Sequence, residues 1–282
     1  MTDVVDRMRP RKRGRLARWL NGEGIEVGAL HRPLRVPAGA KVRYVDRMPV
    51  EELRRHYPEL AEYSLVPVDI IGSAEDLSFF PDNSVDFVIA NHLLEHLEYP
   101  IRGLLEFFRV LRPSGIIFLG LPDQRMGIDQ RRPLTSVDHL IDEHYNGAEA
   151  NRRQHYYDWV VLSEQWCGNV EERVDQLMAM DYSIHFHVWR PDTFLDLLTV
   201  TRRTVGLDFE VIAFAPPEYP GDDEFMLLLS KGSCSHPRLP PPIAMPTSYW
   251  DCMRAAIAQS RMRPILRPPY IVGRRLVQRI MR

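Results

Sequence analysis

The 282-residue chain is 45% hydrophobic, which provides enough apolar surface for one large α/β core with insertions. Its formal net charge of −2 hides an asymmetry: residues 1–20 carry seven basic and two acidic side chains and residues 261–282 carry seven arginines, which leaves the stretch between them at −14. No run of about 18 to 20 apolar residues occurs, so we expect no membrane span, and the basic N-terminus lacks the apolar stretch of a secretory signal. The three cysteines lie far apart in no metal-binding spacing, so we expect reduced thiols and a cytoplasmic protein.

Residues 7–20 form the basic N-terminal segment and predict an arm that leads into a short helix, with Trp19 and Leu20 turned inward. The preferred interpretation is a helix that caps the sheet and closes over the ligand. An arm that binds a polyanion is the alternative.

Residues 24–46 contain the first candidate ligand-binding pattern. A short apolar strand carries Glu26 and runs into Gly28, and a second strand at residues 42–45 ends on Asp46. An acidic residue about 20 positions after a strand–glycine turn is placed to bind the ribose of an adenosyl ligand in doubly wound α/β domains. The pattern lacks further glycines at residues 31–33, so an ordinary strand–turn–strand is the alternative.

A second candidate lies in the middle of the chain. Residues 85–90 are mostly apolar and predict a buried parallel strand, with Asn91 and His92 at its carboxyl end. Ligands of open α/β sheets bind at that edge. In the loop before the strand, Ala74 and Glu75 could offer backbone N–H groups and a carboxylate to an adenine ring, while a solvated loop is the alternative.

The remaining elements are predicted from apolar runs and from turn and breaker residues. They are a helix at 49–62 broken at Pro58, a strand at 66–70, a helix at 104–111, a strand at 116–121, a helix at 191–200, and strands at 209–214 and 225–230. His96 is interpreted as a structural helix residue.

These segments together carry a family resemblance. An Ala-Glu-Asp-Leu loop, an Asp-Phe-Val-Ile strand, a Leu-Glu-His helix and an Arg-Val-Leu-Arg-Pro-Ser-Gly segment follow one another between residues 74 and 115. Residues 24–123 resemble class I S-adenosylmethionine-dependent methyltransferases in these motifs. The resemblance implies a doubly wound, Rossmann-like α/β sheet of seven strands with the last strand antiparallel, S-adenosylmethionine as methyl donor, and an acceptor site in the segment after strand 5.

That segment, residues 124–190, holds five of the ten histidines, interleaved with carboxylates and aromatic residues. A hydroxyl is a poor nucleophile near neutral pH, so its methylation is helped by a base. On a helix, Asp138 and Asp142 share a face, and His139 neighbours Asp142 and Glu143. We expect His144 to be the general base, with His139 as the second candidate.

Metal and substrate contacts are also expected from this region. Mg²⁺ usually takes one or two carboxylates, so Asp123 and Asp142 are the candidate ligands if a metal assists. His185 and His187 alternate and would project to the same side of an extended segment, but no cysteine or third histidine lies nearby in sequence. Lining of the acceptor pocket is therefore preferred for a group of five residues: His155, Tyr156, His185, His187 and Trp189.

The form of the first motif, with the Asp-His-Leu and His-Phe-His-Val-Trp runs, is similar to actinobacterial saccharide O-methyltransferases of the methylmannose polysaccharide type. The resemblance implies a sugar or short oligosaccharide acceptor, with a mannoside favoured. A natural-product or lipid methyltransferase, a nucleic-acid methyltransferase and a non-catalytic binding protein are the alternatives. The acidic body argues against nucleic acid.

We expect a single domain over residues 1–282, with a donor-binding half at 24–123 and an acceptor insertion at 124–190. Residues 235–247 are rich in proline and predict an extended wrap. Residues 271–282 predict a basic amphipathic helix, for which packing on the acidic body is preferred over a membrane surface or a subunit. The two basic ends also favour a homodimer.

Overall fold

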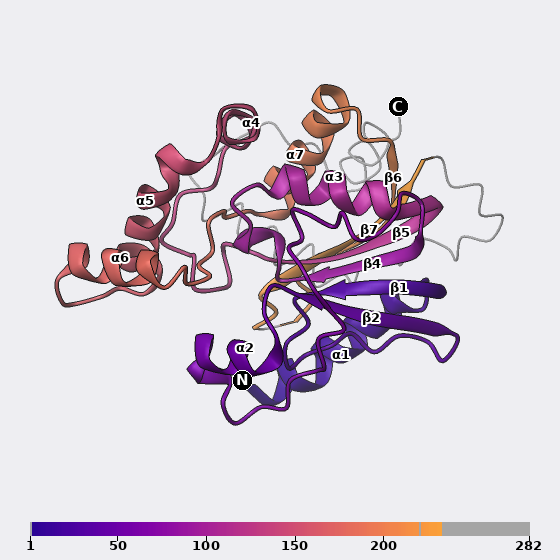
Figure 1. Cartoon of the computed structure of the whole chain (residues 1–282), viewed down its shortest axis with the longest axis horizontal. Helices are drawn as coiled ribbons and strands as arrows, with labels where there is room; N and C mark the ends of the chain where they lie inside the picture. Colours follow the sequence, from indigo (N-terminus) through magenta and orange to yellow (C-terminus); the bar gives the residue numbers. More distant parts are fainter. Residues whose placement is uncertain (1, 220, 233–282) are drawn as a thin grey trace.

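The computed structural model describes residues 2–219 and 221–232. Seven strands form one sheet in the order β3-β2-β1-β4-β5-β7-β6 (Figure 1). The strands are β1 (Gly22–Val27), β2 (Ala40–Asp46), β3 (Ile70–Ile71), β4 (Val85–Asn91), β5 (Leu111–Pro122), β6 (Phe209–Ala215) and β7 (Glu224–Lys231). The pairs among β1 to β5 are parallel, whereas β7 is antiparallel to both β5 and β6. The predicted seven-stranded Rossmann-like sheet with an antiparallel last strand is confirmed.

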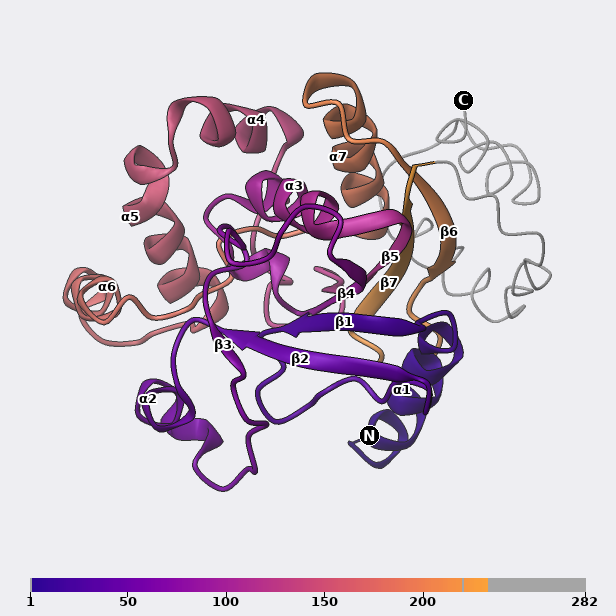
Figure 2. The same ribbon diagram turned by 45° about the vertical axis from the view of Figure 1, so that its right-hand side comes forward.

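Helices cover both faces of the sheet, as a parallel sheet with two apolar faces requires. They are α1 (Thr2–Ala17), α2 (Val50–His56), α3 (Pro100–Val110), α4 (Val137–Asn146), α5 (Glu149–Asp158), α6 (Val170–Ala179) and α7 (Pro191–Thr204). Both views place α3 and α7 over one face and α1 on the other, while α4, α5 and α6 lie together beside the sheet (Figures 1 and 2). Among the described helices, none is long and apolar enough to cross a bilayer.

The alternation of side chains along β4 explains the two cores. Val88 and Ala90 belong to the large core that includes α3 and α7, whereas Phe87 and Ile89 belong to the core under α1. The insertion has a third, separate core, whose members are Tyr156, Val160, Val174, Leu177, Ile184 and Phe186. The insertion therefore has an apolar centre of its own.

The N-terminal helix α1 begins at Thr2 and is therefore longer than predicted. Two of its basic side chains form buried ion pairs within the protein. The Lys12 Nζ atom lies 2.7 Å from Asp222 Oδ2, and the Arg13 Nη2 atom lies 2.7 Å from Glu224 Oε2. Lys12 and both carboxylates are almost completely buried. For these two side chains, the capping interpretation therefore fits better than a polyanion-binding arm.

Two strand boundaries differ from the prediction. β3 contains only Ile70 and Ile71. It does not extend back to residue 66, because Pro67 has no N–H to donate and the residues just before β3 form only scattered backbone hydrogen bonds with neighbouring segments. β5 begins at Leu111 rather than at residue 116. Its register against β4 shifts between Val85 and Phe87, so residues 112–115, between the predicted helix and strand, form a bulge within β5. The predicted wrap and helix at 235–282 lie outside the described residues.

Candidate active site

A cavity of about 370 Å³ opens at the carboxyl ends of β1, β2 and β4. This is the edge at which open α/β sheets bind ligands, and the volume is in the range of small-molecule sites, roughly 300 to 1,000 Å³. Its walls come from two parts of the chain. The donor-binding half contributes Gly28, Asp46, Ala74, Glu75, His92 and His96, and the insertion contributes Tyr156, Asp181, Tyr182, Ser183 and Phe186.

The loop after β1 is shaped by Glu26, which lies beneath it. Both carboxylate oxygens of Glu26 lie 3.0 Å from the backbone N–H of Leu34, and Asn91 Nδ2 donates to Oε1 at 3.4 Å. Burial raises the pKa of Glu26 to about 7, against the effect of these hydrogen bonds. Gly28 turns the chain with a φ of 71°, a conformation that favours glycine. Glu26 and Asn91 thus support the loop and are absent from the cavity lining, whereas Gly28 forms part of it.

The donor-binding half contributes three carboxylates to the cavity lining, of which Glu98 forms an ion pair of 2.9 Å with Arg152. Asp46 ends β2, and its Oδ1 accepts a hydrogen bond of 2.8 Å from the Arg47 backbone N–H. Burial raises the pKa of Asp46 to about 6. Glu75 accepts a hydrogen bond of 2.7 Å from the backbone N–H of Tyr99, so one of its oxygens is already engaged. Asp46 and Glu75 thus both accept a backbone hydrogen bond, and Asp46 is the candidate for the ribose because it ends β2 at the carboxyl edge of the sheet.

His92 follows β4 and is held between two buried carboxylates. Its Nε2 lies 3.0 Å from Glu224 Oε2, and its Nδ1 lies 3.5 Å from Glu95 Oε1. The residue adopts a φ of 49°, uncommon for a non-glycine residue and typical of functional sites. Hydrogen bonding from His92 and the charge of Arg13 overcome burial and hold the pKa of Glu224 well below its usual range. Glu224 is thus an ionised partner for a half-exposed imidazole at the cavity wall.

His96, by contrast, is hydrogen-bonded to the insertion. Its Nδ1 lies 2.9 Å from the carbonyl oxygen of Ile184 and 3.1 Å from Ser183 Oγ. Burial, followed by the neighbouring His185, lowers the pKa of His96 well below its usual value. The ring is therefore neutral at pH 7 and serves to join the insertion to the sheet.

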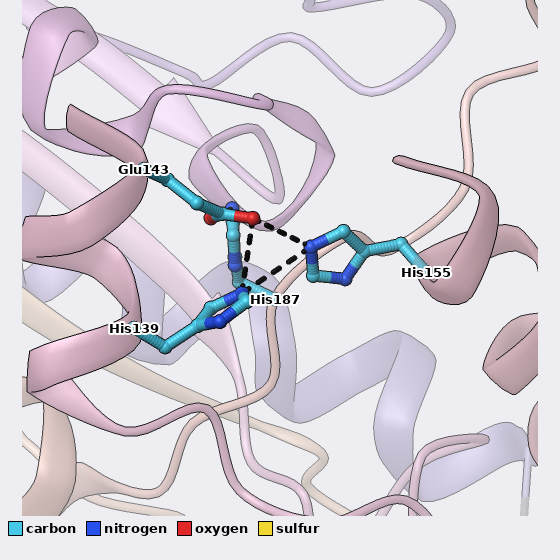
Figure 3. Close-up of side chains that lie close together, drawn as sticks. All are labelled: His139, Glu143, His155 and His187. Atoms are coloured by element: carbon cyan, nitrogen blue, oxygen red, sulfur yellow. Dashed lines mark hydrogen bonds and ion pairs between the residues drawn. The ribbon is translucent and has the colours of Figure 1, made fainter. Parts of the chain in front are cut away.

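A second polar centre lies behind the insertion wall, where His139, Glu143, His155 and His187 point toward one another (Figure 3). The Nε2 atoms of His139 and His155 lie 3.0 and 2.9 Å from Glu143 Oε1 and 3.3 Å from each other. Glu143 is buried, yet hydrogen bonds from these two imidazoles outweigh burial and bring its pKa down to about 2. Burial lowers the pKa of His187 to about 3. The centre thus combines an ionised carboxylate with three imidazoles.

Comparison with known proteins identifies the fold. Residues 22–119 match the model of the family described as a methyltransferase domain, and the strand order and the antiparallel β7 agree with that assignment. The matched residues and the sheet topology show the Rossmann-like fold of S-adenosylmethionine-dependent methyltransferases. The matched segment contains β1, β2, β4 and most of β5, so it includes the donor-side wall of the cavity.

Solved structures of methyltransferases are similar to this chain at low identity. A methyltransferase from Thermotoga maritima has 17% identity and a TM-score of 0.43, with 82% of this chain and 92% of that one covered. The arsenic(III) methyltransferase of Chlamydomonas reinhardtii has 17% identity and a TM-score of 0.38, covering 76% and 64%. The carbon methyltransferase of CurJ has 14% identity and a TM-score of 0.41, covering 76% of this chain. The chain spans about half, 49%, of the CurJ methyltransferase chain.

These structural similarities say nothing about the acceptor of the methyltransferase, because all three TM-scores are below 0.5. No curated protein matches the chain.

Several residues predicted for the site of the methyltransferase lie outside the cavity lining. The ring of His144 packs on Tyr145 at 4.9 Å between centroids, and burial lowers its pKa. His185 Nδ1 lies 2.6 Å from Asp129 Oδ2, and Trp189 is buried in the main core.

The two predicted magnesium ligands are not brought together into a ligand set. Asp123 is buried and forms an ion pair of 2.5 Å with Arg125. Asp142 is exposed and accepts a hydrogen bond of 2.7 Å from Asn146. Within the described residues, neither belongs to a cluster of three or more side chains suited to a metal.

The predicted acceptor residues divide among three places. Tyr156 lines the cavity, His155 and His187 join the centre behind the wall, and His185 approaches His96 with ring centroids 4.6 Å apart. His185 and His187 therefore serve neighbouring but different clusters. Sequence reasoning did not assign a site role to Glu143, although its i, i+4 spacing from His139 on a helix was the available signal.

Proposed function

We propose that this chain transfers a methyl group from S-adenosylmethionine to a hydroxyl of a sugar or short oligosaccharide, with a mannoside as the favoured acceptor. The observation that carries the proposal is the composition of the cavity, in which the donor-binding edge of the sheet faces an insertion wall of tyrosines and polar groups. Such walls suit a hydroxylated ligand, because rings pack on its apolar faces while polar groups hold its hydroxyls.

The donor fits the sheet side of the cavity. Gly28 lets the backbone approach a ligand, and the Asp46 carboxylate at the end of β2 can accept hydrogen bonds from two ribose hydroxyls. Ala74 and Glu75 line the same side and would contact the adenine. S-adenosylmethionine supplies a sulfonium-bound methyl group, which is transferred by in-line displacement.

Among the imidazoles that line the cavity, His92 is the best placed to take the proton of the acceptor hydroxyl, through Nδ1, whose contact with Glu95 Oε1 at 3.5 Å is longer than an ordinary hydrogen bond. It lies at the cavity wall after β4, and the ionised Glu224 would orient its imidazole and stabilise the imidazolium that forms. The sequence predicted His144 as the general base, with His139 second, but neither residue is part of the cavity lining, so we assign the role to His92.

Arg47 would help to hold the insertion against the donor-binding half, beside the acceptor. The Nη1 atom of Arg47 lies 3.2 Å from Asp181 Oδ2, and Nη2 donates to the Asp181 carbonyl at 3.2 Å. The link joins the residue after Asp46 to the insertion, so donor and acceptor walls are held together at one point. Positioning of both substrates is a large part of such catalysis.

The test combines donor binding with a panel of acceptors. Calorimetric titration of S-adenosylhomocysteine into the purified protein should show binding with micromolar affinity. Turnover with mannosides, followed by mass spectrometry of the product, should exceed turnover with an apolar phenol or a lipid. Absence of S-adenosylhomocysteine binding would overturn the donor site, and turnover restricted to the apolar acceptors would overturn the saccharide assignment.

A further inference from the structure

We propose that His139, Glu143, His155 and His187 bind one divalent transition-metal ion, with zinc the best match. The four side chains converge from three segments of the insertion (Figure 3). Their candidate ligand atoms lie within 4.8 Å of one another. The cavity itself does not contain them, so this is a separate site.

The distances fit a tetrahedral ion. With Zn–N bonds of about 2.0 to 2.1 Å, neighbouring ligand atoms of a tetrahedron lie about 3.3 Å apart. The Nε2 atoms of His139 and His155 are 3.3 Å apart, and Glu143 Oε1 is 3.0 and 2.9 Å from them. His187 Nε2 completes the group at 3.7 Å from Glu143 Oε2. Since all the ligand atoms lie within 4.8 Å of one another, binding would require shifts on the order of 1 Å to reach tetrahedral separations.

Hydrogen bonds alone leave this cluster poorly satisfied. If His139 and His155 both donate to Glu143 Oε1, their two N–H groups also face each other across 3.3 Å. Asn151 donates to the same oxygen at 3.2 Å, so Oε1 is crowded. Among the described residues, Glu143 Oε2 has no hydrogen-bond partner, although it is buried. Buried polar atoms are normally paired, and a cation among the lone pairs would remove the conflict.

The donor set selects the kind of metal. Imidazole nitrogens suit zinc, iron, copper and nickel, whereas Mg²⁺ prefers oxygen ligands and retains several waters. The site offers three imidazoles and a single carboxylate. Four protein ligands also complete a tetrahedral zinc ion, which is the pattern of structural rather than catalytic zinc. The ion would therefore organise the protein without taking part in methyl transfer.

The position of the ligands indicates what the ion would hold together. His139 and Glu143 come from α4, His155 from α5, and His187 from the extended segment before α7. Tyr156 and Phe186, each next to a ligand in the chain, line the cavity. One ion would thus fix three segments of the insertion and, with them, the cavity wall. The metal site itself does not depend on the proposed function; only the expected effect of the ion on acceptor binding rests on it.

Metal content tests the site directly. The full chain, produced with added zinc and then dialysed, should contain about one zinc ion per chain by plasma mass spectrometry. His139→Ala, Glu143→Gln and His155→Ala should each lose it. His144→Ala is the matched control, because His144 lies on the same helix outside the cluster, and this variant should keep the ion. A wild-type chain without stoichiometric zinc, or cluster variants that retain it, would overturn the proposal.

A spectroscopic test remains valid if a variant folds poorly. Co²⁺ titrated into metal-stripped wild-type protein should give the intense visible bands of tetrahedral coordination, and excess Mg²⁺ should not suppress them. Weak bands typical of an octahedral aquo ion would contradict the site. His139 is the most exposed ligand, with its side chain 32% accessible, so His139→Ala is the variant best able to keep its fold.

Kinetic measurements then distinguish a failure of the metal-site proposal from a failure of the proposed function. Removal of zinc should raise the acceptor KM at least tenfold while S-adenosylhomocysteine affinity stays within about threefold. An unchanged KM would overturn the wall-fixing role. If the wild-type protein binds no S-adenosylhomocysteine, the proposed function fails, whereas the zinc stoichiometry still decides the metal site.

Discussion

His92 Nε2 lies 3.0 Å from Glu224 Oε2, which joins the carboxyl end of β4 to the beginning of β7. Glu224 is fully buried and is also paired with Arg13 of α1. A carboxylate fixed from behind in this way holds the imidazole in one orientation at the cavity wall. The pair therefore links the antiparallel strand β7 to the cavity at the carboxyl edge of the sheet.

His92→Gln should lower kcat on the order of 10²-fold, because the proton of the acceptor hydroxyl would lose its base. S-adenosylhomocysteine affinity, measured by calorimetry, should change much less than kcat. His144→Gln is the matched comparison, since His144 lies outside the cavity lining. A larger loss of kcat in His144→Gln than in His92→Gln would show that the general base lies on α4 instead.

Asp46→Ala should weaken S-adenosylhomocysteine binding at least tenfold, which corresponds to about 1.4 kcal/mol. The reason is the loss of the carboxylate that faces the ribose position at the end of β2. Calorimetry should show no comparable loss for Glu23→Ala, because Glu23 is exposed near the opposite end of β1. Equal affinity in wild type and Asp46→Ala would contradict the ribose assignment.

Glu26 should make the protein less stable as the pH rises through the range from about 4.5 to 7. Burial raises its folded-state pKa to about 7, above the ordinary value of 4.5. Between these values the unfolded chain releases the proton and the folded chain keeps it, so the free energy of unfolding falls by up to about 3 kcal/mol.

Urea denaturation of wild type and Glu26→Gln at pH 4, 5, 6, 7 and 8 checks this expectation. The stability of wild type relative to the variant should decrease through that range and level off above it, because the amide does not titrate. A difference that is constant with pH would show that Glu26 has an ordinary pKa in the folded protein.

Lys12→Met should destabilise the fold by about 3 to 5 kcal/mol, because it leaves Asp222 buried without its cation. Lys41→Met is the control for loss of a lysine ion pair at the surface. Lys41 and Glu23 are 80% and 68% exposed, so that change should cost less than about 1 kcal/mol. Similar midpoints for both variants in denaturant would show that the Lys12 pair contributes no more than a surface contact.

The sequence determined most of the donor-binding half. The apolar run of β4, the glycine turn after Glu26 and the acidic end of β2 are local patterns, and each predicted its element and its edge of the sheet. Boundaries depended on pairing instead. The bulge in β5 and the short length of β3 follow from the hydrogen-bonded pairing of these strands with their neighbours in the sheet.

Only the tertiary structure decided which polar residues meet. His187 seemed to lack further histidines nearby, yet His139 and His155 reach it across 48 and 32 positions of the chain. Asp123 and Asp142 looked like partners but found Arg125 and Asn146 instead. Periodicity in a sequence reports which face of an element is buried, whereas the convergence of side chains depends on how separate elements pack, and no local pattern records that.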